Sequence, residues 1–164
     1  PLNTREVVEN IKKRYPGIVL RTSVITGFPS ETESDFKELA DFIKENHFEH
    51  VGVFGYSDQK DAKSYTMKNK INDGLIEKRK QTIASLQFEN VLKNNKNKIG
   101  KTFEVLIENI NGKKASGRAN FQAPEIDNNF IFDLKSNNIK TGEFKKIIVS
   151  GVKDYDIIGK LDTK

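Results

Sequence analysis

The sequence predicts an α/β part followed by an all-β part, with a long helix between them. Up to about residue 70, helical patterns alternate with short apolar runs, which is the order of a parallel sheet. A stretch without Pro, and without Gly after Gly74, then continues to about Asn97, as in a long helix. From Thr102 onward, apolar and polar residues alternate with the period of a strand. We expect a βα-type unit over residues 1–70, a linker helix over 71–98 and a small five-stranded antiparallel barrel over 99–164.

Two helices are expected in the first part. Asn3 followed by Glu6 resembles an N-terminal cap with its acidic partner, and apolar residues then recur at helical spacing. Thr32 and Asp35 repeat this capping pattern, and the apolar positions after them predict a helix over residues 33–46.

Two strands are expected beside these helices. Residues 18–26 are almost continuously apolar or β-branched, as in a strand that is covered on both faces of a parallel sheet. Residues 51–56 form a second short apolar run. The polar segment that follows, residues 57–72, is predicted to be a surface loop.

The last part of the chain is predicted to contain only strands. Alternation is clearest over residues 102–108 and 144–149, and a final apolar run spans residues 157–159. Asn111-Gly112 and Thr141-Gly142 mark turns. About five short strands suit a small barrel, because closure removes exposed sheet edges.

Composition excludes several classes of site within these 164 residues. No cysteine is present, which excludes disulfides, thiolate catalysis and thiolate-held metal clusters. The formal net charge of +5 is compatible with nucleic acid or an acidic surface as partner. No run approaches the roughly 18 to 20 apolar residues that cross a bilayer, and no secretion signal opens the chain, so a cytoplasmic protein without membrane contact is expected. The start at Pro1, without Met, suggests a piece of something longer.

The junction between the first strand and the second helix is the most informative segment. Residues 21–36 deliver a strand to the turn Gly27-Phe28-Pro29 and then to a capped helix. Backbone amides face outward at such a junction and the helix dipole favours negative charge, so ligands commonly bind there. By spacing alone, an ordinary strand-to-helix connection explains the same residues.

This junction resembles the fifth-strand motif of radical S-adenosylmethionine enzymes in their methylthiotransferase branch, which typically reads Gly-Phe-Pro-Gly-Glu-Thr. Residues 51–57, Val-Gly-Val-Phe-Gly-Tyr-Ser, are similar to the sixth strand of that family. Ser30 departs from the family's glycine, and at φ > 0 it would cost on the order of 1 kcal/mol. The resemblance implies that residues 1–70 are the C-terminal part of a TIM-like partial barrel and that five residues form a wall beside the cofactor's adenine: Val24, Ile25, Gly27, Phe54 and Tyr56. The alternative is that the apolar ones among them are only core.

The β part resembles the TRAM domain, a small barrel that closes methylthiotransferases and holds their macromolecular substrate. Residues 123–127, Ala-Pro-Glu-Ile-Asp, look like the branch that modifies an aspartate of small-subunit ribosomal protein twelve. The branch that modifies adenosine beside the tRNA anticodon lacks this acidic run. Glu125 and Asp127 would repel a phosphate backbone and suit a basic ribosomal protein, and Arg118 could bind a carboxylate or phosphate. These three are the candidate substrate-binding residues, although both carboxylates could merely solvate a turn and Arg118 could be a solvated strand residue.

The resemblance implies that the intact protein uses S-adenosylmethionine and two 4Fe-4S clusters to insert a methylthio group into a C–H bond. Because such clusters need cysteine thiolates, this chain alone is expected to be inactive and to bind no cofactor. We assign no catalytic residue and no metal ligand; His47 and His50, the only imidazoles, are better explained by a helix C-terminus near His47. A monomer is expected, with ribosomal protein twelve or the ribosome as partner.

Three alternatives remain at this level. The first is a tRNA (N6-isopentenyl)adenosine methylthiotransferase fragment. The second is a stand-alone RNA-binding module, in which phenylalanines of the barrel stack on bases instead of forming its core: Phe103, Phe121, Phe130, Phe132 and Phe144. The third is a structural or interaction domain without chemistry.

Overall fold

A computed structural model describes residues 3–134 and 139–162 of the chain. The chain divides into two compact units, Pro1–Val91 and Leu92–Lys164. Among the described residues, no helix is both long enough and apolar enough to span a membrane.

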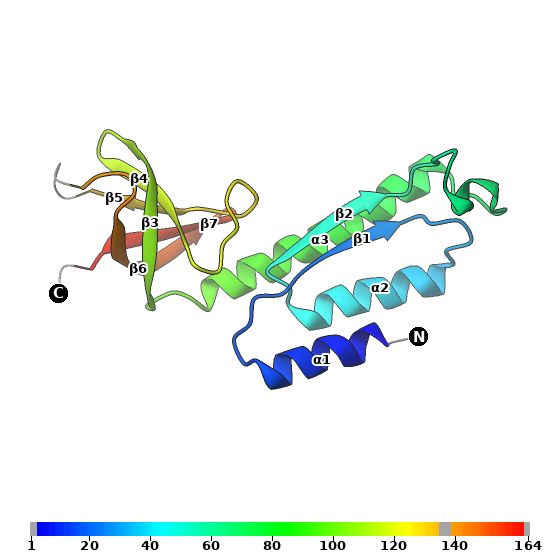
Figure 1. The fold of residues 1–164 in the computed structure, drawn as a ribbon, viewed down its shortest axis with the longest axis horizontal. Coiled ribbons are helices and arrows are strands. Elements are labelled where there is room, and N and C mark those ends of the chain that lie inside the picture. Colours follow the sequence, from blue (N-terminus) through cyan, green and yellow to red (C-terminus); the bar gives the residue numbers. More distant parts are fainter. Residues whose placement is uncertain (1–2, 135–138, 163–164) are drawn as a thin grey trace. The chain divides into compact units, whose positions relative to one another are not determined.

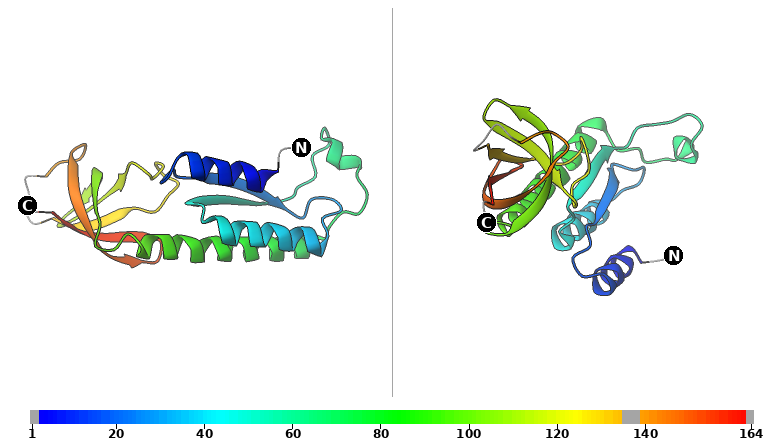
Figure 2. Two further views of the ribbon diagram at one scale, coloured as in Figure 1. Left: turned by 90° about the horizontal axis from the view of Figure 1, so that it is seen from below. Right: turned by 60° about the vertical axis from the view of Figure 1, so that its left-hand side comes forward.

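The N-terminal unit follows the predicted order of helix, strand, helix, strand. Its elements are α1 (Thr4–Arg14), β1 (Arg21–Thr26), α2 (Glu33–Asn46), β2 (His50–Gly55), the 3-10 helix η1 (Lys63–Thr66) and the first part of α3 (Asp73–Lys96). β1 and β2 pair in parallel, so the predicted parallel arrangement is confirmed. Figures 1 and 2 show the two strands side by side with α2 running along them.

Local signals in this unit act as the sequence predicts. Thr32 is the N-cap of α2: its hydroxyl accepts from the Asp35 amide at 3.2 Å, and the Asp35 carboxylate accepts from the Thr32 amide at 2.8 Å. Asn3 caps α1 by accepting from the Arg5 amide. His47 ends α2 in the left-handed conformation. Both helices therefore begin where the capping patterns place them.

The sheet of this unit is covered on one face and open on the other. Buried apolar side chains of α1, α2, β2 and α3 pack together on the covered side: Val8, Ile43, Val51 and Ile83. On the other side Ile25 is 54% exposed and Phe54 is 56% exposed. The predicted strand over 18–26, covered on both faces, is therefore wrong in two respects: β1 begins at Arg21, and its burial alternates. An apolar run predicts a buried strand, but within the described residues only one face receives helices.

The C-terminal unit is a closed barrel of five strands. They are β3 (Thr102–Asn111), β4 (Lys114–Ala119), β5 (Phe130–Asp133), β6 (Phe144–Lys153) and β7 (Asp156–Leu161), paired in the order β3-β4-β5-β7-β6. The predicted number of strands is confirmed, but the prediction of an all-antiparallel barrel is wrong because β5 and β7 pair in parallel (Figure 1). Alternation with a period of two is the same for both kinds of pairing, so the sequence pattern does not separate them.

The barrel interior is apolar. Its buried residues, each at most 2% exposed, are Val105, Ile107, Ala115, Ala119, Phe130, Phe132, Ile147, Val149 and Ile157. Phe103 and Phe121 pack against them as partly buried side chains. Four of the five phenylalanines considered for base stacking therefore belong to the core or its margin: Phe103, Phe121, Phe130 and Phe132. The fifth, Phe144, is 61% exposed.

Candidate functional site

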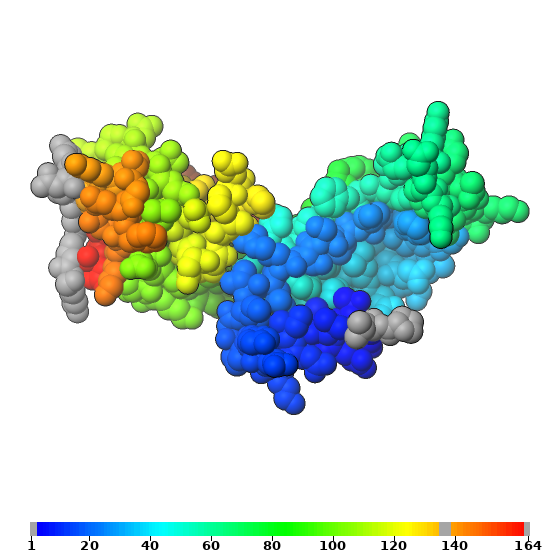
Figure 3. All heavy atoms as spheres, in the orientation of Figure 1, coloured from blue at the N-terminus to red at the C-terminus, as the bar shows by residue number. Residues whose placement is uncertain are grey.

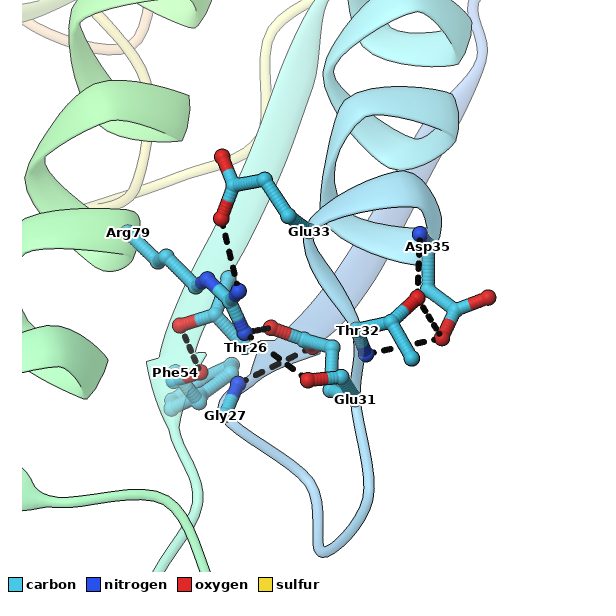
Figure 4. A network of polar contacts seen from close by, with 8 residues as sticks. All are labelled: Thr26, Gly27, Glu31, Thr32, Glu33, Asp35, Phe54 and Arg79. Atoms are coloured by element: carbon cyan, nitrogen blue, oxygen red, sulfur yellow. Dashed lines mark hydrogen bonds and ion pairs between the residues drawn. The ribbon is translucent and has the colours of Figure 1, made fainter.

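The turn after β1 is held in a conformation that favours glycine. Gly27 has φ of 78°, and its amide donates to the Glu31 carboxylate at 3.0 Å (Figure 4). Ser30 also lies in the left-handed region, with φ of 70°. This is the conformation in which serine is expected from the sequence to be less stable than the family's glycine. The Ser30 amide donates to the carbonyl of Asn69 at 3.0 Å. The turn is therefore fixed by hydrogen bonds at both of its left-handed residues.

A buried arginine lies behind this turn. Arg79 of α3 is 4% exposed and donates to the Glu31 carboxylate at 2.6 Å and to the Glu33 carboxylate at 2.9 Å. Its guanidinium also lies 5.1 Å from the centre of the Phe36 ring. Burial by itself would lower the pKa of Arg79, but hydrogen bonds and charge from Glu33 and Glu31 outweigh it and raise the pKa. The sequence pattern does not reveal this network, because Arg79 and Glu31 are 48 residues apart.

The tips of the two strands place three of the predicted cofactor residues near one another. Ile25 and Phe54 are partners in the register, so their exposed side chains lie side by side on the open face. The Tyr56 amide donates to the carbonyl of Thr26 at 2.9 Å, which continues the pairing beyond β2. The Thr26 hydroxyl, fully buried, lies 3.5 Å from the Phe54 carbonyl. The strand ends and the Gly27 turn thus form one continuous edge.

Val24 lies apart from the other predicted cofactor residues. It packs against the core of the βα unit and borders a groove of about 410 Å³ that is also lined by Asn3, Thr22 and Phe42. Successive residues of a strand point to opposite faces, so Val24 and Ile25 cannot line the same surface. The structure therefore brings together Ile25, Phe54, Gly27 and Tyr56, and separates Val24 from them.

A polar cluster beyond β2 was not predicted. The Tyr56 hydroxyl donates to Asp58 at 2.7 Å, and Lys70 forms an ion pair with the same carboxylate. The Lys70 ammonium also donates to the carbonyl of Ser64 at 2.8 Å, and the Phe28 ring packs edge-on against Tyr56. Hydrogen bonds from Lys70 and then Tyr56 lower the pKa of Asp58. In the space-filling view the segment between β2 and α3 projects from the rest of its unit (Figure 3). The contacts of Lys70 with Asp58 and Ser64 link the two ends of this segment.

The barrel places the predicted substrate residues in two locations. Arg118 of β4 donates through Nε to Glu108 at 2.6 Å. It lines a groove of about 460 Å³ with six neighbours: Phe103, Glu104, Leu106, Ala119, Asn120 and Phe144. Phe144, one of the five phenylalanines considered for base stacking, is exposed at the start of β6.

The acidic run lies in a tight turn. The Asp127 carboxylate accepts from the Ala123 amide at 2.8 Å, so this side chain has a structural role in closing the turn. Glu125 has φ of 61° and is exposed, and Ile126 beside it is 63% exposed. The turn therefore presents the Glu125 carboxylate and the apolar side chains of Pro124 and Ile126 to solvent.

Comparison with known proteins first defines the class of the barrel. Residues 99–161 match the family model described as the TRAM domain, so the TRAM domain predicted from the sequence is confirmed. Nearly the whole chain is also similar to curated proteins named ribosomal protein uS12 methylthiotransferase RimO. The relative from Clostridium acetobutylicum is 44% identical over 153 residues, which are 93% of this chain and 34% of the relative. The relative from Aquifex aeolicus is 38% identical over 159 residues, covering 95% of this chain and 37% of that protein. The relative from Chlorobaculum parvum is 33% identical over 161 residues, which are 98% of this chain and 37% of the relative.

These relatives confirm the predicted resemblance to methylthiotransferases of the ribosomal-protein type. The chain spans about a third of the length of the curated relatives it matches.

Proposed function

We propose that this chain is the C-terminal part of a radical S-adenosylmethionine methylthiotransferase that adds a methylthio group to an aspartate of ribosomal protein uS12. The observation that carries the proposal is the combination, on one chain, of a parallel strand pair ending in the Gly27 turn and a TRAM barrel. The names of the relatives support the same activity and substrate.

In this proposal the N-terminal unit supplies the last βα units of a TIM-like partial barrel. Both strands of the parallel pair are edge strands within the described residues, and in the whole protein further strands would pair with their outer edges. The exposure of Ile25 and Phe54 supports this role, because apolar side chains on the open face of a sheet suit a barrel interior.

The residues at the strand tips fit an adenine-bearing cofactor. Ile25 and Phe54 offer adjacent apolar surface for a purine, and the turn at Gly27, whose φ is positive, ends β1 beside them. When bound, S-adenosylmethionine and the 4Fe-4S clusters supply the radical chemistry and the sulfur. The residues of this chain bind and orient the purine and exclude water from it. Since the 164 residues contain no cysteine, we expect this chain alone to be inactive.

We assign substrate binding to the barrel. The groove beside Arg118 combines aromatic surface from Phe103 and Phe144 with the Arg118 and Glu104 charges. The turn that exposes Glu125 adds an acidic group, and Asp127 holds that turn in shape. Acidic groups favour encounter with a basic ribosomal protein and disfavour a phosphate backbone.

The test uses the full-length protein, reconstituted with iron and sulfide under reducing conditions. Ribosomal protein uS12 incubated with this enzyme and S-adenosylmethionine should gain the mass of one methylthio group in place of one hydrogen, on an aspartate. The matched control is a variant without its cluster-binding cysteines, which should give no gain. A gain on tRNA, with uS12 unchanged, would move the assignment to the tRNA branch.

One observation favours RNA binding as a second candidate role for the barrel. Phe144 is 61% exposed beside Arg118 and Asn120, a set that could stack on a base and bind phosphate. A salt titration separates the two roles. RNA affinity that is strong at low salt and falls steeply toward physiological salt would support the RNA-binding role over a protein-docking one.

A further inference from the structure

Arg79 is a buried charge whose environment is unusual for a stabilising ion pair. Its side chain is 4% exposed and that of its partner Glu31 is 10% exposed, whereas its other partner, Glu33, is 82% exposed. Removing two charges from water costs several kcal/mol per ion. Replacing a buried ion pair by well-packed apolar residues is often neutral, or stabilises the protein by about 1–4 kcal/mol. Arg79 Nε, moreover, is buried without a hydrogen-bond partner among the described residues. Stability alone is therefore a poor explanation for this arrangement.

The two oxygens of Glu31 connect Arg79 to the turn after β1. Oε1 accepts from Arg79 Nη1 at 2.6 Å, and Oε2 accepts from the Gly27 amide at 3.0 Å. Arg79 Nη1 also lies 3.3 Å from the backbone carbonyl of Glu31. Figure 4 shows the chain of contacts from the α3 helix through Glu31 to the Gly27 amide.

α3 contacts the same turn at a second point. A Cβ atom added at Gly27 would lie 2.4 Å from Cγ1 of Ile76, which is one turn before Arg79 on α3. Ile76 thus packs on the Gly27 backbone, while Arg79 holds the carboxylate that accepts from the Gly27 amide. The conformation of the turn is set from α3, a helix outside the strand-turn-helix motif.

We propose that Arg79 is a positioning residue for the S-adenosylmethionine site, acting through Glu31 on the backbone of Gly27. This inference rests on the proposed function. Without Arg79, the Glu31 carboxylate would be left nearly buried without its main countercharge. It would turn toward water and release the Gly27 amide, and the turn would lose the conformation in which it meets the purine.

The test measures the dissociation constant of S-adenosylhomocysteine for the full-length, cluster-reconstituted protein by calorimetry, with iron content and thermal midpoint determined on the same samples. Arg79→Met should raise the constant on the order of tenfold, the loss typical when a supporting contact behind a binding group is removed. Adding Glu31→Gln to Arg79→Met should restore most of the affinity, because the uncharged amide can stay buried and its oxygen can still accept from Gly27.

Glu33→Gln is the matched control. Glu33 binds the same guanidinium at 2.9 Å, but it is 82% exposed, and within the described part of the chain it contacts Arg79 and not the Gly27 turn. Its loss should therefore change the constant less than twofold. If Arg79→Met does not fold, Glu31→Ala tests the same link, since it removes the acceptor of the Gly27 amide and leaves Arg79 its pair with Glu33.

Four outcomes are decisive. A tenfold loss in Arg79→Met supports the inference if it is measured on folded protein well below its thermal midpoint, with wild-type iron content, and is reversed in the double variant. A merely structural role would lower the midpoint without changing the affinity of the protein that stays folded. Wild-type affinity in Arg79→Met, or in Glu31→Ala, overturns it. Equal loss in Arg79→Met and in the double variant also overturns it. Absence of binding by the wild-type protein would instead overturn the proposed function, and this inference with it.

Discussion

Both units of the chain have an apolar core, but among the described residues only the βα unit buries a charged side chain. Nine described apolar residues are buried in the barrel core, Phe130 and Phe132 among them, and each strand of the barrel pairs on both sides. The βα unit buries Arg79, together with Gln87 and Asn90, whose amides donate to the carbonyls of Phe48 and Ile43. It also leaves Ile25 and Phe54 more than half exposed.

This difference indicates how each unit gains its stability. The barrel contains the partners of its own strands, so its strand pairing is complete within it. In the βα unit, buried polar contacts of α3 fix its position against the neighbouring elements. The apolar side chains at the strand tips, Ile25 and Phe54, stay exposed. Substitutions in the barrel core should therefore lower the free energy of unfolding, whereas substitutions at the strand tips should change ligand affinity more than stability.

The largest expected effect comes from truncating the barrel core. Phe130 is fully buried, so Phe130→Ala should lower the free energy of unfolding by about 3–5 kcal/mol. Ile25→Ala, at a side chain 54% exposed, should change it by no more than about 0.5 kcal/mol. Chemical unfolding of the chain followed by circular dichroism measures both. A loss for Ile25→Ala equal to that for Phe130→Ala would contradict the contrast between the units.

A smaller effect is expected from crowding the barrel wall. A Cβ atom at Gly117 would lie 2.0 Å from the backbone oxygen of Leu106, which cannot move aside as a flexible side chain would. Gly117→Ala should therefore cost about 1–3 kcal/mol of unfolding free energy. Gly151→Ala is the control in the same barrel, since nothing lies within 4 Å of its added Cβ. Equal stabilities of the two variants would show that β4 shifts freely against β3.

Features set by neighbouring residues were predictable from the sequence. The Thr32 cap, the extent of α3 and the strand count depend on spacing and turn residues, and the structure confirms each. Features set by distant residues were not. The parallel pairing of β5 with β7 depends on how the chain returns after β6, and the pair of Arg79 with Glu31 joins residues 48 positions apart. Of the candidate site, the resemblance indicated Ile25, Gly27, Phe54 and Tyr56, but not the buried network behind them.

A still smaller effect is expected at the start of α2. Thr32→Ala removes the side chain that accepts from the Asp35 amide and should cost about 1 kcal/mol. Hydrogen bonds from the Thr32 backbone and then from its hydroxyl lower the pKa of Asp35. Because the folded pKa lies below the unfolded one, this contribution is present above the unfolded pKa of about 3.9 and disappears as pH falls through the lower folded value.

Asp35→Asn should therefore flatten the acid side of the stability profile of the βα unit and leave the neutral region less stable than wild type. Stability measured from neutral pH down to about pH 3, across the unfolded pKa, tests this. An unchanged acid slope in Asp35→Asn would show that another carboxylate controls it.

The smallest effect on stability is expected at the ion pair of Arg118 and Glu108 on the barrel. This pair can be compared directly with the buried pair of Arg79. Arg118 and Glu108 are 30% and 31% exposed, whereas Arg79 is 4% exposed. Glu108→Gln should cost under about 1 kcal/mol, and the cost should vanish near 1 M salt, where the screening length is about 3 Å. The affinity loss of Arg79→Met should persist at the same salt, because a buried pair is screened much less. If both effects disappeared with salt, the Arg79 network would be as open to water as the surface pair, and it could not hold the Gly27 turn.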